Sequence, residues 1–154
     1  MLYRLKHRNL CMLQDFFAAE LSPSVRRMTA ANPEEYLLTY PPRSRRSMLR
    51  YGFDHAAALS ESIGRRTGIA WEPTLCRMGG QEQKHLTRAE RKENARAGYR
   101  LRDGLDLQGR RILLVDDIVT TGATLGAAER LLRRAGAREV IGVVLAVTLK
   151  EEPI

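Results

Sequence analysis

The sequence predicts an α/β protein with parallel strand pairing, and two observations carry this prediction. Residues 112–115 and 140–148 are short, continuous apolar runs, which are typical of parallel strands buried on both faces. Between them, apolar side chains recur at helical spacing from Leu125 to Ala135. Residues 112–148 are therefore expected to form a strand–helix–strand unit, which is parallel by necessity and right-handed in nearly all proteins.

Composition limits the class of protein. The chain has 154 residues, of which 44% are hydrophobic, enough for a buried core. No apolar run could span a bilayer and the start of the chain lacks the apolar core of a signal peptide, so we expect a cytoplasmic protein without membrane contact. Cys11 and Cys76 are too few for a disulfide framework or a zinc site. Without repeats or linkers, residues 1–154 are expected to form a single domain.

The charge balance favours an anionic partner. The chain carries 26 Lys and Arg against 18 Asp and Glu, a formal net charge of +8. A nucleotide, pyrophosphate or nucleic acid would suit this charge. The surplus of basic residues is weak evidence for any of these partners, because a basic surface also simply keeps a protein soluble.

Two elements are expected in the first third of the chain. Apolar spacing predicts an amphipathic helix over 9–21, ended by the following Pro23. A polar loop is expected over 22–35. Residues 36–40 have the composition of a strand, which the Pro-Pro pair at 41–42 stops.

Shorter signals place the elements that precede the central unit. Asp54 is expected to cap a helix that ends near Gly68. Short strands are expected at 69–71 and at 99–101, and Gly136 is expected to end the central helix.

The loop before the central helix has the chemistry of a phosphate site. Asp116 and Asp117 are expected to end the first central strand, and residues 120–124, Thr-Thr-Gly-Ala-Thr, turn the chain into the helix. A helix N-terminus offers unpaired N–H groups and partial positive charge. Threonine hydroxyls add donors, and Gly122 lets the backbone come close. The carboxylates suit sugar hydroxyls or a hydrated cation, so the stretch indicates a cradle for ribose 5-phosphate.

An arginine-rich loop follows the first expected strand. Four arginines fall within eight residues, at Arg43, Arg45, Arg46 and Arg50. Guanidinium forks match phosphate oxygens, so the loop is a candidate diphosphate site. A solvated basic loop explains the same residues, and the sequence leaves both interpretations open.

The most polar stretch of the chain, 78–97, is a candidate mobile lid. Its two glycines at 79–80 permit flexibility, and Lys84, His85 and Arg88 are among its charged residues. Such a lid would carry cations to an anionic substrate. An exposed loop and helix of mixed charge is the alternative, and His85 is a candidate proton donor only if the lid closes over a reaction.

Residues 112–124, ILLVDDIVTTGAT, resemble the diphosphoribosyl-binding signature of type I phosphoribosyltransferases, without a mismatch. Residues 40–68, YPPRSRRSMLRYGFDHAAALSESIGRRTG, resemble the competence protein F (ComF) branch of that family. So does the pattern of Gln83, Leu86, Arg91 and Asn94 that follows, and the resemblance covers about 5–148. It implies a three-layer α/β fold, with a mainly parallel twisted sheet and flanking helices.

The resemblance also implies roles for individual residues. Asp116 and Asp117 would be the catalytic pair, accepting hydrogen bonds from ribose hydroxyls that also chelate Mg²⁺, with the metal reached mostly through ligand or water. The 5-phosphate would be held by Thr120, Thr121, Gly122, Ala123 and Thr124. Pyrophosphate would be held by Pro42, Arg43, Ser44, Arg45 and Arg46. The mobile loop would span 77–98, with Lys84, His85 and Arg88.

The implied activity is binding of 5-phosphoribosyl 1-diphosphate or a nucleoside monophosphate, with phosphoribosyl transfer and release of pyrophosphate. The chain departs from the branch in three places. The cysteine-rich zinc segment is absent, so no zinc is expected. Tyr51 stands where the branch usually has Arg, and residues 79–81 replace a basic residue and a Thr. These changes bear on turnover more than on 5-phosphate binding.

Two other interpretations compete with an enzyme of this family. A receiver domain also begins with such an apolar run and acidic pair, but only 37 residues follow Asp117 and the Thr-rich turn has no place in that fold. The other rival is a non-catalytic module of the same fold, acting in DNA uptake, competence or regulation through single-stranded DNA or protein partners. The sequence leaves open the acceptor substrate and whether the chain forms a homodimer.

Overall fold

A parallel sheet of three strands lies at the centre of the molecule. The computed structural model describes residues 2–44, 48–49, 52–78 and 98–148, with side chains from residue 12 onward. The strands are β1 (Tyr36–Thr39), β4 (Arg111–Val119) and β5 (Glu139–Val147), in the order β1-β4-β5. Both pairs are parallel. The strand–helix–strand unit expected from the two apolar runs is thus confirmed.

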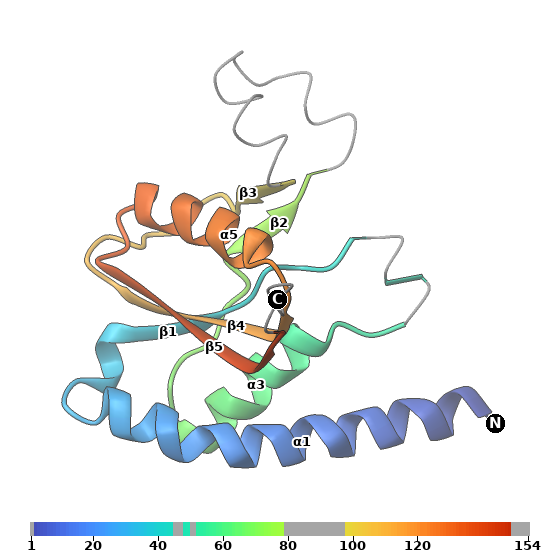
Figure 1. Cartoon of the computed structure of the whole chain (residues 1–154). Helices are drawn as coiled ribbons and strands as arrows, with labels where there is room; N and C mark the ends of the chain where they lie inside the picture. Colours follow the sequence, from blue (N-terminus) through green and yellow to red (C-terminus); the bar gives the residue numbers. More distant parts are fainter. Residues whose placement is uncertain (1, 45–47, 50–51, 79–97, 149–154) are drawn as a thin grey trace, which may run out of the picture.

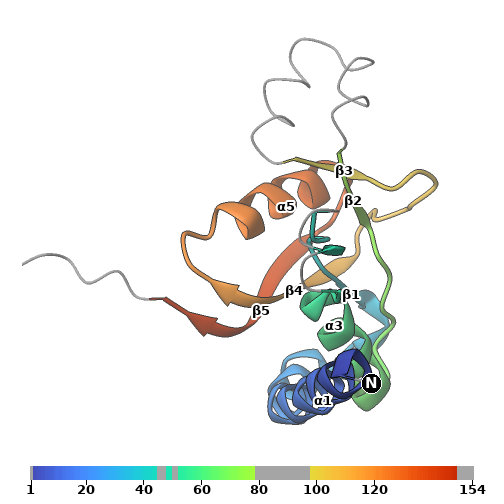
Figure 2. The same cartoon turned by 90° about the vertical axis from the view of Figure 1, so that its right-hand side faces the viewer.

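Helices cover both faces of this sheet. The helices α1 (Leu2–Thr29) and α3 (His55–Thr67) lie on one face, and α5 (Ala123–Arg134) lies on the other (Figures 1 and 2). Leu113 and Val115 of β4 face the first layer, while Ile112 and Leu114 face α5. Because strand side chains alternate, one buried strand supplies both halves of the core. The three-layer α/β fold is confirmed.

The first helix is longer than the sequence indicates. It runs from Leu2 to Thr29 with Pro23 inside it, so the expectations of a helix ending before Pro23 and of a loop from residue 22 are wrong. The helix continues because its later turns are buried against α3 and the core, with Val25 and Thr29 1% and 3% exposed. Tertiary packing here outweighs the hydrogen bond that proline removes.

The helix α3 begins and ends as expected. The Asp54 side chain accepts a hydrogen bond from the Ala57 N–H at its start, and Gly68 ends it with φ +77°. Glycine adopts the left-handed backbone conformation at the end of a helix without strain. The 3-10 turn η1 (Pro33–Glu35) precedes β1.

The strand β4 extends beyond the acidic pair. Residues 116 and 118 still pair with Val144 and Ala146 of β5, so the expectation that Asp116 and Asp117 end the strand is wrong. The strand continues because β5 is equally long and pairs with residues on both sides of Asp117, for which the register gives no partner. Both carboxylates therefore take the alternating orientations of strand residues.

A small antiparallel hairpin lies beside α5. Its strands are β2 (Leu75–Arg77) and β3 (Tyr99–Leu101); the second was expected, the first was not. The strand expected at 69–71 is reduced to a single bridge between Leu38 and Trp71. The predicted mobile loop lies outside the described residues except at its two ends. Among the helices described, none is long and apolar enough to cross a membrane.

Candidate functional site

A pocket lies where β4 gives way to α5, at the carboxyl end of the sheet. It is open to solvent, and the empty space among its lining residues, open solvent included, amounts to about 230 Å³. One carboxylate of the acidic pair and the whole hydroxyl-rich turn line it together: Asp116, Ile118, Val119, Thr120, Thr121, Gly122, Ala123, Thr124 and Leu125. The structure thus places Asp116 and residues 120–124, all predicted site residues, around one space.

The turn before α5 is open to a ligand. Gly122 adopts φ +70° at the N-cap, and no side chain caps the helix. A Cβ at Gly122 would meet nothing within 4 Å. Glycine therefore suits this position because it adopts the left-handed backbone conformation, and not because a neighbouring atom leaves no room for a side chain. The first N–H groups of a helix have no intrahelical partner, and their field favours an anion. The pocket can therefore receive a phosphate.

The two carboxylates of the acidic pair have different surroundings. Asp116 shares the α5 face of β4 with Ile112 and Leu114, and it lines the pocket. Asp117 shares the opposite face with Leu113 and Val115, on the side of α3. The period of two in the strand therefore gives the two carboxylates different neighbours.

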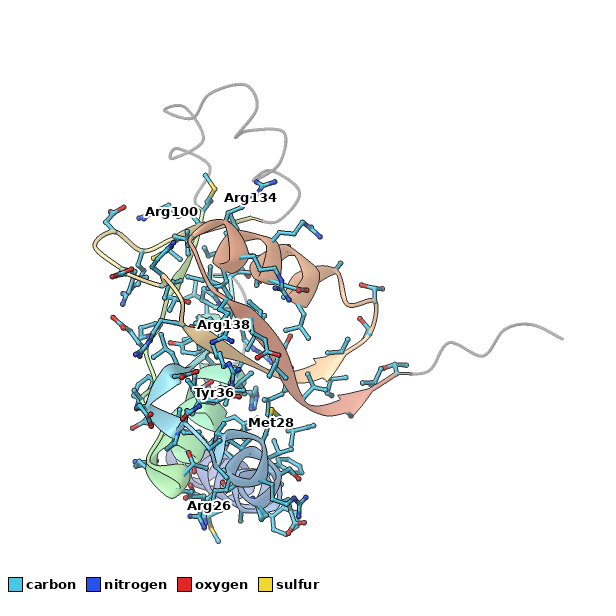
Figure 3. The ribbon with its side chains drawn as sticks, turned by 90° about the vertical axis from the view of Figure 1, so that its left-hand side faces the viewer. Arg26, Met28, Tyr36, Arg100, Arg134 and Arg138 are labelled. Atoms are coloured by element: carbon cyan, nitrogen blue, oxygen red, sulfur yellow. The ribbon has the colours of Figure 1, made fainter. Side chains whose placement is uncertain are left out.

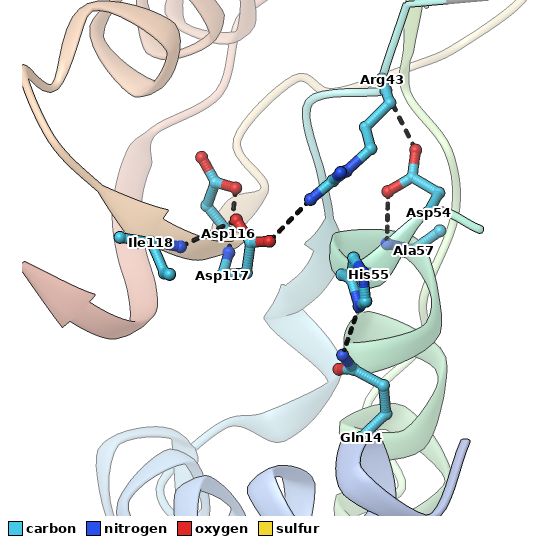
Figure 4. Close-up of polar contacts among 8 residues, drawn as sticks. All are labelled: Gln14, Arg43, Asp54, His55, Ala57, Asp116, Asp117 and Ile118. Carbon is cyan, nitrogen blue, oxygen red and sulfur yellow. Dashed lines mark hydrogen bonds and ion pairs between the residues drawn. The ribbon is translucent and has the colours of Figure 1, made fainter. Parts of the chain in front are cut away.

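An ion pair joins Asp117 to the loop that follows β1. Nη2 of Arg43 donates to Oδ2 of Asp117 at 2.7 Å (Figure 4). The two side chains are 27% and 26% exposed, so water screens the pair less than it screens a surface pair. The structure thereby brings together two predicted site residues that lie 74 positions apart in the sequence. Of the other predicted pyrophosphate residues, Pro42 and Ser44 are half-buried, and Arg45 and Arg46 lie outside the described residues.

The two carboxylates also differ in pKa. Burial raises the pKa of Asp116 to about 6, and the negative charge of Asp117 adds to that rise. Burial alone would also raise the pKa of Asp117. The hydrogen bond from the Ile118 N–H and the charge of Arg43 outweigh burial, and the pKa lies below its ordinary value. Asp117 thus keeps its charge to a lower pH than Asp116, which changes charge in mildly acidic solution.

Three residues beside this ion pair were not assigned to a site from the sequence. The Asp54 carboxylate accepts from the Arg43 N–H at 3.0 Å as well as from the Ala57 N–H. Nε2 of Gln14 lies 2.8 Å from Nδ1 of His55, the first residue of α3. Burial, followed by the charge of Arg43, lowers the pKa of His55. Helix capping was the only signal for Asp54 in the sequence; His55 and Gln14 carried none.

The base of the predicted mobile loop is described at both ends. The strand β2 ends at Arg77 and β3 begins at Tyr99, so the two strands flank the loop. The guanidinium of Arg77 lies 4.7 Å from the centre of the Tyr99 ring. This cation–π contact joins the exposed Arg77 of β2 to the buried Tyr99 of β3. Lys84, His85 and Arg88 lie outside the described residues.

The donor set near the pocket suits a shared magnesium ion. Among the residues with described side chains, no group of three or more His, Cys, Asp or Glu could hold a metal alone. Mg²⁺ is commonly held by one or two carboxylates together with substrate phosphates. Asp116 lines the pocket and offers such a carboxylate, with Asp117 adjacent in the strand. The residues present therefore fit a Mg²⁺ that a phosphorylated ligand also coordinates.

A parallel α/β sheet, a hydroxyl-rich turn before a helix and an acidic pair at one sheet edge are typical of proteins that bind phosphorylated sugars or nucleotides. Comparison with known proteins identifies the family. Residues 77–152 match the family model described as phosphoribosyl transferase domain.

Two kinds of protein are among the curated relatives. The DNA utilization protein YhgH of Salmonella typhimurium is 35% identical over 117 residues, 75% of this chain and 50% of that protein. Adenine phosphoribosyltransferase of Mycobacterium marinum is 39% identical over 95 residues, 61% of this chain and 48% of that enzyme. The chain thus spans about half the length of these relatives. The match over residues 77–152 confirms the resemblance to the phosphoribosyltransferase family, and the match to YhgH agrees with the ComF-like branch expected from the sequence.

Solved structures show the same fold. A glutamine phosphoribosylpyrophosphate amidotransferase from B. subtilis superposes with a TM-score of 0.57 at 20% identity, covering 85% of this chain and 25% of that chain. A hypoxanthine-guanine phosphoribosyltransferase from Bacillus anthracis superposes with a TM-score of 0.58 at 11% identity, covering 94% of this chain and 75% of that chain. The fold is that of the type I phosphoribosyltransferases.

Proposed function

We propose that the chain binds 5-phosphoribosyl 1-diphosphate and transfers its phosphoribosyl group to an acceptor, releasing pyrophosphate. One observation carries the proposal: Asp116 lines the same pocket as the phosphate turn 120–124. The turn would hold the 5-phosphate through backbone N–H groups and threonine hydroxyls. Asp116 and Asp117 would accept hydrogen bonds from the ribose hydroxyls.

The charge distribution suits this reaction. Breaking the bond at the anomeric carbon leaves positive charge on the ribose ring and negative charge on pyrophosphate. The acidic pair offsets the first charge, and Arg43 in the loop after β1 offsets the second. A bound Mg²⁺ would neutralise part of the charge on the leaving group. The proposed chemistry needs no side-chain nucleophile, so the chain's residues bind, orient and stabilise charge.

A turnover assay tests the enzymatic part. Pyrophosphate release from 5-phosphoribosyl 1-diphosphate and Mg²⁺ would be measured with ammonia, glutamine and the common nucleobases as acceptors. We expect release with at least one acceptor and its loss in the Asp116→Asn/Asp117→Asn double variant. Binding of the diphosphate without release for every acceptor would exclude the enzyme and leave a binding module.

A non-catalytic role with nucleic acid is the second candidate. The curated relatives named DNA utilization proteins and the net charge of +8 favour it. Arg100 of β3 and Arg134 of α5 also lie at the same end of the molecule (Figure 3). Contacts to phosphates release counterions, so binding should weaken as salt rises. A titration of single-stranded DNA at two salt concentrations tests this role; affinity that is independent of salt would contradict it.

A further inference from the structure

The Asp54 carboxylate connects two parts of the protein at once. Its Oδ1 accepts from the Ala57 N–H at 3.2 Å, which caps α3. Its Oδ2 accepts from the Arg43 N–H at 3.0 Å, eleven positions earlier in the chain. The same carboxylate therefore joins the start of the arginine-rich loop to the start of a buried helix (Figure 4).

Arg43 is the residue that reaches the acidic pair. Its guanidinium lies 2.7 Å from Asp117, and its backbone N–H is the group that Asp54 holds. The position of the guanidinium thus depends on a backbone anchored to α3. The helix α3 is itself packed on the core, with Leu59 and Ile63 fully buried. A rigid element supports the loop at the residue whose side chain enters the site.

We infer that Asp54 is a positioning residue for the diphosphate end of the site, acting through Arg43. This inference rests on the proposed function. Asp54 contacts no ligand in this scheme; it sets where the loop leaves β1 and so where the Arg43 guanidinium meets the diphosphate. Preorganised cations stabilise a leaving group without reorganisation cost, so losing the tether should weaken ligands that carry a diphosphate.

The alternative is that Asp54 serves only as a helix cap. The two roles need different numbers of acceptor oxygens. Capping needs one acceptor, which asparagine also supplies. The cap and the tether together need two acceptors, and asparagine has only one carbonyl oxygen, with an NH₂ group in place of the other. In Asp54→Asn that NH₂ group would face the Arg43 N–H, donor against donor, if the cap is kept.

Calorimetric titration of two ligands separates these roles. We would compare 5-phosphoribosyl 1-diphosphate and ribose 5-phosphate, each with Mg²⁺, on the wild type, Asp54→Asn, Arg43→Gln and the double variant. We expect Asp54→Asn to weaken the diphosphate ligand about tenfold, as for one poorly placed charged hydrogen bond, and to leave ribose 5-phosphate unchanged. Without the Arg43 guanidinium, Asp54→Asn should have no further effect.

Gly68→Ala provides the matched control. It strains the other end of α3, where φ is +77° and a Cβ meets nothing, so it destabilises the helix without touching the tether. We expect it to leave both affinities unchanged. Equal weakening of both ligands by Asp54→Asn, or the same loss in the Arg43→Gln background, would overturn the inference.

Hydrogen exchange of the Arg43 amide, measured without ligand, separates this inference from the proposed function. Faster exchange in Asp54→Asn than in wild type supports the tether, and unchanged exchange refutes it. If the wild type bound neither ligand, the proposed function and the ligand role of Asp54 would both fail, whereas the exchange result would still decide whether the tether exists.

Discussion

Arg43 and Asp117 lie 74 positions apart in the chain, and their side chains form an ion pair of 2.7 Å at the carboxyl end of the sheet. Parallel pairing of β1 with β4 makes this contact possible, because it brings the ends of both strands to the same edge. The cationic loop and the acidic pair, two separate features of the sequence, are thereby parts of one site.

Removing the negative charge of Asp117 should reduce stability in a pH-dependent way. The folded-state pKa is lowered, so this carboxylate stabilises the fold above its ordinary pKa of 3.8, and the contribution is lost as pH falls through the folded value. We expect Asp117→Asn to lower the free energy of unfolding by about 1 kcal/mol at neutral pH. Urea unfolding should show this difference shrinking below pH 3.8; a constant difference would contradict the assignment.

Asp116 should have the opposite pH dependence. Its folded-state pKa is raised from 3.8 to about 6, so its contribution to stability is fully present below 3.8 and is lost as pH rises through about 6. We expect Asp116→Asn to be more stable than wild type at neutral pH, and the advantage to fall away on acidification. Thermal unfolding in metal-free buffer, from acidic to neutral pH, measures this difference in stability. If Asp116→Asn and wild type had the same unfolding temperature at every pH, the raised pKa would have to be assigned to another group.

Much of the fold could be predicted from local patterns. The apolar runs of β4 and β5 and the spacing in α5 define a parallel unit, since each signal is continuous in the sequence. The ends of elements were harder to predict. Polar residues at 116 and 117 resemble the end of a strand, but pairing with β5 continues beyond them.

The contacts of the site depend on strand order, which local patterns do not contain. Residues 120–124 and Asp116 were found because they are close in sequence. The Arg43–Asp117 pair requires β1 to be the neighbour of β4. The second hydrogen bond of Asp54 requires the loop after β1 to return to α3. Neither is a property of any short stretch of residues.

Gly122→Ala should affect stability and binding together. The residue has φ +70°, and a Cβ would meet nothing within 4 Å, so the cost is backbone strain of about 1 kcal/mol. We expect weaker ribose 5-phosphate binding, because the phosphate turn would change shape. Gly68→Ala, with φ +77° and equally open surroundings, should lose similar stability and keep its affinity. Urea unfolding measures the stability of the two variants, and calorimetry measures their affinity for ribose 5-phosphate. Equal loss of affinity in the two variants would rule out a specific role for the turn.

Pro23→Ala should stabilise the protein. Pro23 lies inside α1, where it cannot donate to the carbonyl four residues earlier, and its side chain is exposed. Restoring an N–H and a good helix former should raise the free energy of unfolding by about 1–3 kcal/mol. The neighbouring exposed position supplies the control, since Ser24→Ala should change stability by less than about 0.5 kcal/mol. A loss of stability in Pro23→Ala would mean that the proline has a structural role in the helix.

One titration tests directly whether Asp116 and the phosphate turn form one ligand pocket. Calorimetry would follow 5-phosphoribosyl 1-diphosphate with Mg²⁺ binding to wild type, Asp116→Asn and Asp103→Asn. Asp103 is a charge-matched control, because its side chain is fully exposed, at 100%, and it does not line the pocket. We predict binding to wild type and Asp103→Asn, and at least about tenfold weaker binding to Asp116→Asn. Equal affinity in all three proteins, or no binding to wild type, would show that Asp116 and the phosphate turn do not form a pocket for this ligand.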